Sequence, residues 1–203
     1  MNNSNRFALT SERLNLVIAA CAILISAASF YATFLQADSA EKQVRAMTLP
    51  LIQFQHGNYN QDIDQRAIDF TLKNAGVGPA IIHSIELEYQ GENYSNFVEF
   101  LQACCGEAYE SYERNFENLV VDEMRLIDGG MVTDGLRNVT LAGQSDYLFF
   151  QLYYGDLSRD FWEKLNQERW RVSLDVCYCT LLDDCFRSQG NTQITEISSC
   201  PVE

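Results

Sequence analysis

The feature that most constrains this chain is an apolar run near its N-terminus, Leu14 to Leu35, which contains no charged side chain. At a rise of about 1.5 Å per residue, a helix over this run covers the roughly 30 Å hydrocarbon core of a bilayer. Phe30, Tyr31 and Phe34 lie near its C-terminal end, where aromatic side chains favour the membrane interface. The run therefore predicts a transmembrane helix over residues 14–35.

A cleaved signal peptide is the alternative interpretation of the same run. Ala37 to Ser39 offers small residues at a cleavage position. The apolar core of a signal peptide is usually about 7–15 residues long, so the greater length of this run favours an uncleaved anchor. Arg6 and Arg13 precede the run, and the positive-inside rule then places residues 1–13 in the cytoplasm.

Residues 36–48 contain neither proline nor glycine, which predicts that the helix continues as a stalk. Pro50 then ends it, because the residue before a proline disfavours the helical conformation. Within residues 14–35, small side chains recur four residues apart, a spacing that lets two membrane helices approach closely. These pairs are Ala22/Ser26, Ala28/Ala32 and Ser29/Thr33. The pattern allows a homo-oligomer, although alanine and serine are common in any membrane helix.

The region beyond the run is strongly acidic. Two of the 14 basic residues and one of the 28 acidic residues precede residue 38, so 12 basic and 27 acidic residues remain. This balance argues against nucleic acid and against a basic patch that binds anionic lipid headgroups. Other membrane or envelope proteins are the partners that we expect.

Six of the seven cysteines follow the apolar run, and Cys21 lies inside it. The six are Cys104, Cys105, Cys177, Cys179, Cys185 and Cys200. An even number of cysteines in an exported domain predicts disulfides, whose connectivity the spacing leaves open. Cys179 and Cys185 flank a predicted hairpin tip and could face each other across it. Cys104 and Cys105 are adjacent, so a bridge between them would be strained and we expect each to pair elsewhere.

Two other interpretations compete for Cys177, Cys179 and Cys185. A zinc site could combine these three with Cys104 or Cys105, although the spacing does not match a zinc ribbon. A thiol-redox role would need a lowered thiol pKa. The neighbouring aspartates, Asp175, Asp183 and Asp184, would instead raise it. Structural disulfides are therefore favoured over a metal-responsive or redox protein.

From residue 49 onward the apolar residues alternate with polar ones, a period typical of half-buried antiparallel strands. The predicted strands cover Ile52–His56, Ile68–Lys73, Ile81–Tyr89, Tyr147–Tyr154, Trp170–Tyr178 and Gln193–Ile197. Tyr147–Tyr154 is apolar on both faces and is predicted as a central strand. Two helical regions interrupt the strands. The first covers residues 95–119, where Ser95 caps a helix that ends near Gly106 and a second helical patch follows. The second is a helix capped by Ser158.

The segment Phe70–Ile82 has the sequence FTLKNAGVGPAII. We expect Asn74, Gly76 and Gly78 to supply the unusual backbone angles of a tight connection between two strands. This turn resembles the one in bacterial extracytoplasmic immunoglobulin-like domains, including CARDB-like adhesion and scaffold modules. It also resembles small bacterial proteins with an N-terminal anchor and one such domain. The resemblance covers about 40 residues of one strand pair. It implies an Ig-like β-sandwich and a binding or scaffolding role.

No catalytic constellation is present in the sequence. The two histidines, His56 and His83, fall on the apolar face of predicted strands, where a histidine is usually a hydrogen-bonded core or edge residue. Oxygen-bearing residues alternate from Asn58 to Asp64 as in a calcium loop, but Ile63 and Asp69 replace the glycine and glutamate that such a loop requires. A polar hairpin loop explains this segment better.

Together these patterns predict a mainly β, non-enzymatic protein without a cofactor or a metal. It would be a single-pass protein of a bacterial inner membrane, with residues 49–203 in the periplasm as an Ig-like β-sandwich that carries a helical insertion at 95–119. Its expected function is to bind or position another envelope protein. The alternative is an envelope thiol-redox or metal-responsive protein that uses Cys177, Cys179 and Cys185.

Overall fold

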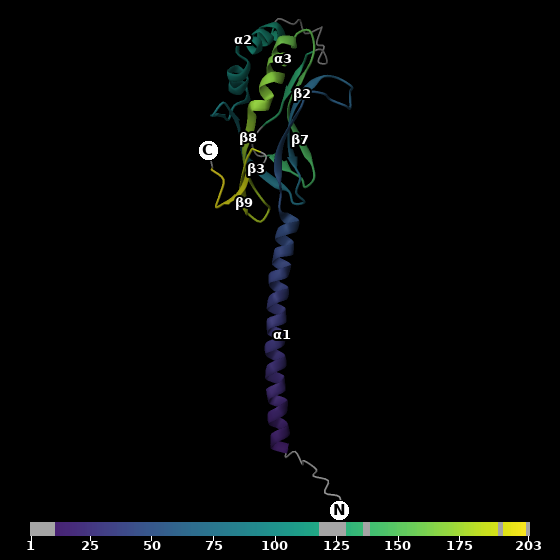
Figure 1. The fold of residues 1–203 in the computed structure, drawn as a ribbon, viewed down its shortest axis with the longest axis vertical. Helices are drawn as coiled ribbons and strands as arrows, with labels where there is room; N and C mark the ends of the chain where they lie inside the picture. Colours follow the sequence, from purple (N-terminus) through teal and green to yellow (C-terminus); the bar gives the residue numbers. More distant parts are fainter. Residues whose placement is uncertain (1–10, 118–128, 136–138, 191–192, 202–203) are drawn as a thin grey trace, which may run out of the picture. The chain divides into compact units, whose positions relative to one another are not determined.

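The structure is a computed structural model that describes residues 11–117, 129–135, 139–190 and 193–201 (Figure 1). It contains two compact units, Met1–Met47 and Thr48–Glu203. The described part of the first belongs to one helix, α1 (Ser11–Thr48), which covers both the predicted span and the predicted stalk. The second holds the described strands and the remaining helices.

None of the side chains of α1 is buried within the protein. Its apolar residues are correspondingly exposed, with Leu16 at 72 % and Phe30 at 76 %. The helix is long and apolar enough to cross a membrane, with a mean hydropathy of 2.1 over its best window. Because such a surface is unfavourable in water, an apolar environment around this helix agrees with its composition.

The strands of the second unit form two antiparallel sheets. The four-stranded sheet has the order β1-β2-β7-β5, and the six-stranded sheet has the order β10-β9-β8-β3-β4, with β6 paired to β3. Their bounds are β1 (Ile52–Gly57), β2 (Ala67–Asn74), β3 (Ala80–Tyr89), β4 (Glu92–Tyr94), β5 (Met131–Thr133), β6 (Val139–Leu141), β7 (Asp146–Tyr153), β8 (Val172–Cys179), β9 (Cys185–Gln189) and β10 (Gln193–Ile197).

The two sheets contribute to one hydrophobic core. Along β2, Ile68, Phe70 and Leu72 are fully buried while the alternate residues are half-exposed, as the period-two pattern predicts. Leu87 of β3 and Tyr178 of β8 belong to the same cluster from the other sheet. The predicted central position of β7 is confirmed, since it pairs with β2 on one side and with β5 on the other.

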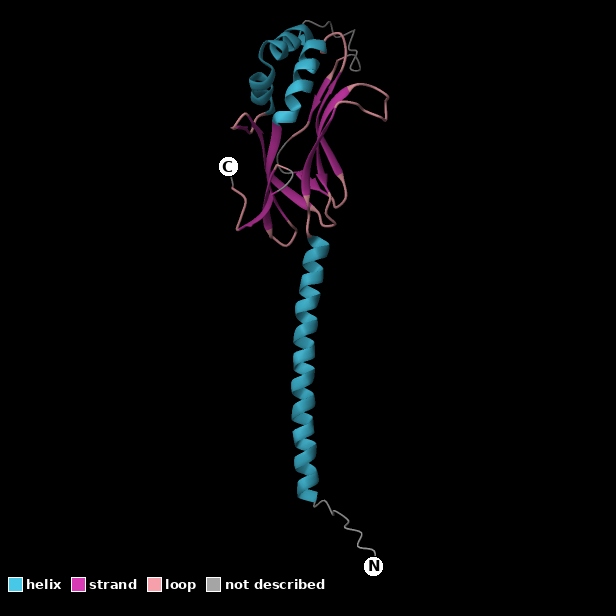
Figure 2. Ribbon diagram, in the orientation of Figure 1, coloured by secondary structure: helices cyan, strands magenta, loops and turns pink. Residues whose placement is uncertain are grey.

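Two helices lie side by side at one end of the sheets, α2 (Phe97–Glu117) and α3 (Arg159–Glu168) (Figure 2). A short 3-10 turn, η2 (Arg169–Arg171), links α3 to β8. This end carries Ala67 and Tyr153, which face each other in the β2–β7 pair. The opposite end carries the Asn74 turn, where the second unit begins at Thr48.

The Asn74 turn is built around one buried amide. Asn74 is completely buried, and its Oδ1 accepts hydrogen bonds from the backbone N–H of Leu51 (3.1 Å) and Gly76 (3.0 Å). Its Nδ2 donates to the carbonyls of Gly78 (2.8 Å) and Ala142 (3.1 Å). One side chain therefore ties together the segment before β1, the turn itself and the segment between β6 and β7.

The glycines of this turn are explained by close approach rather than by the unusual backbone angles predicted for them. Neither Gly76 nor Gly78 has a positive φ. A Cβ on Gly76 would lie 2.3 Å from the carbonyl oxygen of Leu49, and one on Gly78 would lie 1.9 Å from that of Thr48. The chain that enters the second unit therefore crosses the turn at a distance that only glycine permits.

The structure corrects several details of the predicted elements. The predicted break near Gly106 is confirmed: this residue adopts non-helical angles (φ 45°, ψ −122°), so α2 consists of two helical segments that meet at a kink. Asn96, not Ser95, caps it, since Asn96 Oδ1 accepts the N–H of Val98 at 2.9 Å. Ser158 precedes α3 but makes no capping bond. Residues 118 and 119 of the predicted insertion lie outside the described residues.

Two strand predictions also fail locally. A register shift between Ile82 and Ser84 in β3 places Ile82 in the core and exposes His83. β8 starts at Val172, so Trp170 belongs to η2 and is 70 % exposed instead of facing the core. Of the described residues, 41 % are helix and 35 % are strand, so "mainly β" holds only for the second unit.

Candidate functional site

The six cysteines after α1 are all paired. Cys177 is joined to Cys200 and Cys179 to Cys185, while Cys104 is joined to Cys105. The predicted bridge across the hairpin tip is confirmed, because Cys179 and Cys185 face each other in the β8–β9 pair. Cys21 is the free cysteine among the described residues.

The prediction that Cys104 and Cys105 pair elsewhere is wrong. Both lie in α2 immediately before the Gly106 kink, and both are 4 % exposed within the main hydrophobic core. The other four cysteines form a separate cluster with Ile197. The zinc site that would have combined the two groups is therefore not assembled.

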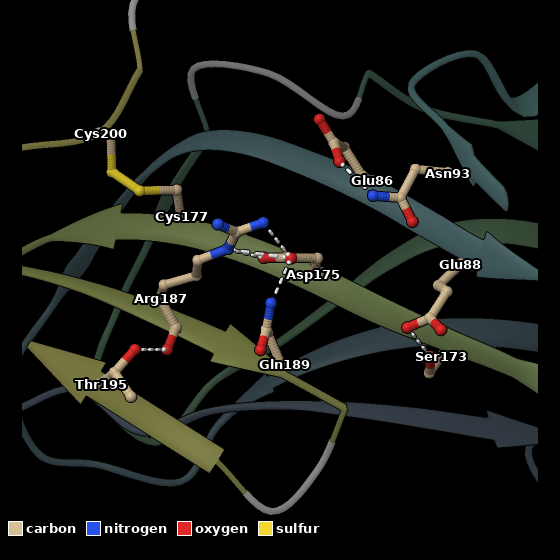
Figure 3. A network of polar contacts seen from close by, with 10 residues as sticks. All are labelled: Glu86, Glu88, Asn93, Ser173, Asp175, Cys177, Arg187, Gln189, Thr195 and Cys200. Carbon is tan, nitrogen blue, oxygen red and sulfur yellow. Dashed lines mark hydrogen bonds and ion pairs between the residues drawn. A yellow bond between two sulfur atoms is a disulfide. The ribbon is translucent and has the colours of Figure 1, made fainter. Parts of the chain in front are cut away.

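The four-cysteine cluster lies on the outer face of the six-stranded sheet, where Figure 3 shows the bridge between Cys177 and Cys200. Cys177 and Cys179 share this face because side chains alternate along β8, whose other face contributes Val176 and Tyr178 to the core. Cys200 reaches the face from the segment that follows β10. The Sγ atoms of Cys179, Cys185 and Cys200 all lie within 4.8 Å of one another.

A polar network continues the same face from the cluster (Figure 3). Asp175 Oδ2 accepts hydrogen bonds from Arg187 Nη2 (2.5 Å) and from Gln189 Nε2 (3.1 Å). The hydrogen bond to Asp175 raises the pKa of the Arg187 guanidinium. Because these groups satisfy one another, this part of the face is a stable polar surface rather than a set of reactive groups.

A cavity of about 420 Å³ lies between α2 and α3. α2 contributes Glu107, Ala108, Ser111, Tyr112 and Asn115 to its lining, and the α3 side contributes Asp156, Leu157, Arg159, Asp160 and Phe161. The size is comparable to the smaller ligand sites of proteins.

The wall of this cavity is held by aromatic contacts. Phe161 of α3 lies 5.2 Å from the ring of Tyr109 and 5.3 Å from that of Tyr112, measured between ring centroids. Burial raises the pKa of Tyr112 to about 12, so its hydroxyl is neutral at physiological pH. Tyr109 donates a hydrogen bond to Glu113 at 2.6 Å. The two helices are therefore a packed pair, and the cavity between them is preformed.

His56 is a hydrogen-bonded edge residue, as predicted. Its Nδ1 lies 2.6 Å from Nη1 of Arg169. Since arginine can only donate, Nδ1 is the acceptor and a neutral His56 carries its proton on Nε2. Burial, and secondly the charge of Arg169, lower the pKa of His56. The ring of Trp170 lies 4.8 Å from that of His56.

The calcium-like segment is a polar hairpin loop, as the sequence favoured. Asn60 and Gln65 pair across it, and Asn60 Oδ1 accepts the backbone N–H of Asp62 at 3.0 Å. The Tyr59 hydroxyl donates to Asp64 Oδ1. Two of the candidate ligand oxygens, Asn60 Oδ1 and Asp64 Oδ1, are thus engaged by the loop itself.

Comparisons with known proteins add no relative: no family model matches this chain, and neither does a curated protein or a solved structure.

The cavity between α2 and α3 had no signal in the sequence beyond the helical spacing of the aromatic residues in 95–119. The part played by Cys200 was also missed, because its pairing depends on where the segment after β10 runs.

Proposed function

We propose that this chain is a single-pass protein of a bacterial inner membrane whose second unit, Thr48–Glu203, is a periplasmic Ig-like β-sandwich that binds or positions another envelope protein. A helix able to span a bilayer precedes the unit. Three disulfides within the unit agree with an oxidising compartment. Two antiparallel sheets that share one core support the sandwich class.

The observation that carries the binding function is the cavity between α2 and α3. The helical insertion lines one side of it, and insertions are where a scaffold commonly carries recognition. It is also at the end of the sheets away from Thr48, where the chain enters the unit.

The charges that line the cavity indicate the chemistry of the partner. Glu107 and Asp160 line it from opposite helices, and within the described ranges neither makes an ion pair. Arg159, the basic residue of the lining, is paired with Asp156. The cavity therefore favours a basic side chain of a partner protein, which would gain a carboxylate on each side.

Ala108 provides a test because it lines the cavity and is only half-buried. Ala108→Phe would fill part of the cavity while leaving the aromatic wall in place. The matched control is Ala103→Phe, the same change at an exposed position of the same helix. Each tagged full-length variant is cross-linked in native membranes, and the captured proteins are quantified by mass spectrometry.

We expect at least one partner to be captured by both the wild-type chain and Ala103→Phe. Its captured amount should fall by about tenfold or more with Ala108→Phe. A tenfold loss corresponds to about 1.4 kcal/mol of binding free energy. The same set of partners for both variants would contradict the proposal. Equal thermal unfolding of the two variants shows that a loss reflects the cavity and not the fold.

A second candidate function is an envelope thiol-redox or metal-responsive protein that uses Cys177, Cys179 and Cys185. The observation that favours it is the contact between two disulfides, in which Cys179 Sγ lies 3.8 Å from Cys200 Sγ. Metal analysis and thiol trapping on protein from native membranes test it. Bound zinc or a labile pair would support this function, and three intact bridges without metal would contradict it.

A further inference from the structure

The two disulfides on the outer face of the six-stranded sheet are in sulfur-to-sulfur contact. Cys179 Sγ belongs to the Cys179–Cys185 bridge and lies 3.8 Å from Cys200 Sγ, which belongs to the Cys177–Cys200 bridge. All four cysteines are at most 8 % exposed, so no water layer separates them. A thiolate formed at Cys179 would be held against a disulfide sulfur.

We propose that this cluster is a site of thiol–disulfide exchange, whose substrate class is a dithiol, such as the reduced active site of a thioredoxin-like protein. The dithiol attacks Cys185 Sγ and then resolves the mixed disulfide with its second thiol. The dithiol is thereby oxidised to a disulfide, and Cys179 and Cys185 gain the two electrons and two protons.

The second step is internal and redox-neutral. The Cys179 thiolate attacks Cys200 Sγ, forming the Cys179–Cys200 bond and breaking the Cys177–Cys200 bond. The electron pair leaves on Cys177, which takes a proton from solvent. The segment that carries Cys200 is then attached two residues further along β8, a displacement of about 7 Å.

The two pairings close loops of nearly the same length. The Cys177–Cys200 bridge has a sequence separation of 23, and the alternative bridge from Cys179 would have a separation of 21, from the residue numbers. Loop closure entropy depends only on the logarithm of this length, so this contribution separates the two pairings by far less than tenfold. Both cysteines also point from the same face of β8, so exchange requires no change of strand register.

The inference adds Cys200 to the three cysteines of the second candidate function and rests on the contact between the two bridges. It can fail even if native membranes hold a labile Cys179–Cys185 pair, because that pair could open without any attack on Cys200. It does not depend on the cavity or on the binding function.

The test uses the full-length chain with Cys185→Ser, which leaves Cys179 without its hairpin partner. The matched control is Cys179→Ser, which leaves the Cys185 thiol instead. Protein in detergent is incubated at mildly alkaline pH without reductant, quenched with acid and alkylated. The bridges are then mapped after digestion; cleavage after Tyr178 separates Cys177 from Cys179.

We expect the Cys185→Ser sample to contain two kinds of molecule, in which Cys200 is bridged either to Cys177 or to Cys179, each at about 10 % or more. The free thiol lies on whichever of Cys177 and Cys179 is not bridged. In Cys179→Ser the Cys177–Cys200 bridge should remain by far the major one. Only the Cys177–Cys200 bridge in Cys185→Ser would overturn the proposal, and so would equal exchange in the two variants. The Cys104–Cys105 bridge is an internal standard in each digest.

The wild-type chain gives a second measurement if a variant folds poorly. It is treated with less than one equivalent of a small dithiol, quenched and mapped in the same way. The proposal expects that about 10 % or more of the singly reduced molecules carry a Cys179–Cys200 bridge with free Cys177 and Cys185. If all singly reduced molecules at this cluster keep the Cys177–Cys200 bridge, with free Cys179 and Cys185, the proposal is overturned.

Discussion

The amide of Asn74 is expected to be one of the largest polar contributions to the stability of the second unit. Asn74→Ala removes four hydrogen bonds to backbone groups at once. Two of those groups, the N–H of Gly76 and the carbonyl of Gly78, belong to buried residues that water does not reach. An unsatisfied buried group costs about 1–3 kcal/mol, so the free energy of unfolding should fall by about 4 kcal/mol.

The assay is urea unfolding of the full-length chain in detergent with its disulfides intact. Trp162 is 2 % exposed, so its fluorescence reports the loss of the core. The matched control is Asn93→Ala, in which an exposed asparagine loses one hydrogen bond to Glu86. This control should lose no more than about 0.5 kcal/mol.

Asn74→Asp tests the donor of the amide separately from its acceptor. It keeps an oxygen for the two N–H groups but turns a carboxylate toward two carbonyls, so its stability should recover as pH falls and the carboxyl gains a proton. A loss below about 1 kcal/mol for Asn74→Ala, or no pH dependence for Asn74→Asp, would refute the reasoning.

Two further predictions concern backbone approach and pH. Gly78→Ala should cost about 3 kcal/mol of unfolding free energy, because its Cβ would meet the Thr48 carbonyl, whereas Gly135→Ala has open space and should be nearly neutral in the same urea assay. Burial and the arginine that it contacts lower the pKa of His56 in the folded state, so the unfolded chain takes up the proton first. Stability should therefore fall as pH drops below about 6.5 and stop falling below the lowered pKa. A urea series between pH 7.5 and 5.5 should show this loss reduced in His56→Gln and retained in His83→Gln; an equal loss in both variants would contradict it.

The sequence determined the features that depend on neighbours along the chain. The apolar run Leu14–Leu35 is a one-dimensional property of length and composition, so the helix was predictable from it. The period of two did the same for β2, because one face of its pattern is apolar. The Cys179–Cys185 bridge followed from a hairpin whose two ends are local.

Other features required the tertiary structure, because they join residues that are distant in sequence. His56 and Arg169 are 113 residues apart and meet only once β1 and η2 have been placed by their sheets. The bridge between Cys177 and Cys200 depends on the path of the segment after β10. Sequence spacing alone cannot supply these distances, because many folds with the same strands would place the residues apart.

Single residues also took roles that their pattern could not reveal. Ile82 lies in the core in place of Ile81. The reason is a register shift in β3 between Ile82 and Ser84, across which the alternation of side chains between the two faces is reversed. Gly78 is required by the passage of Thr48 and not by its own backbone angles. The sequence thus determined the long apolar helix and the strands β1, β2, β3, β7, β8 and β10, but not the short strands β4, β5, β6 and β9. Packing between distant segments decided which side chains meet, since those contacts form only when the whole sheet order is in place.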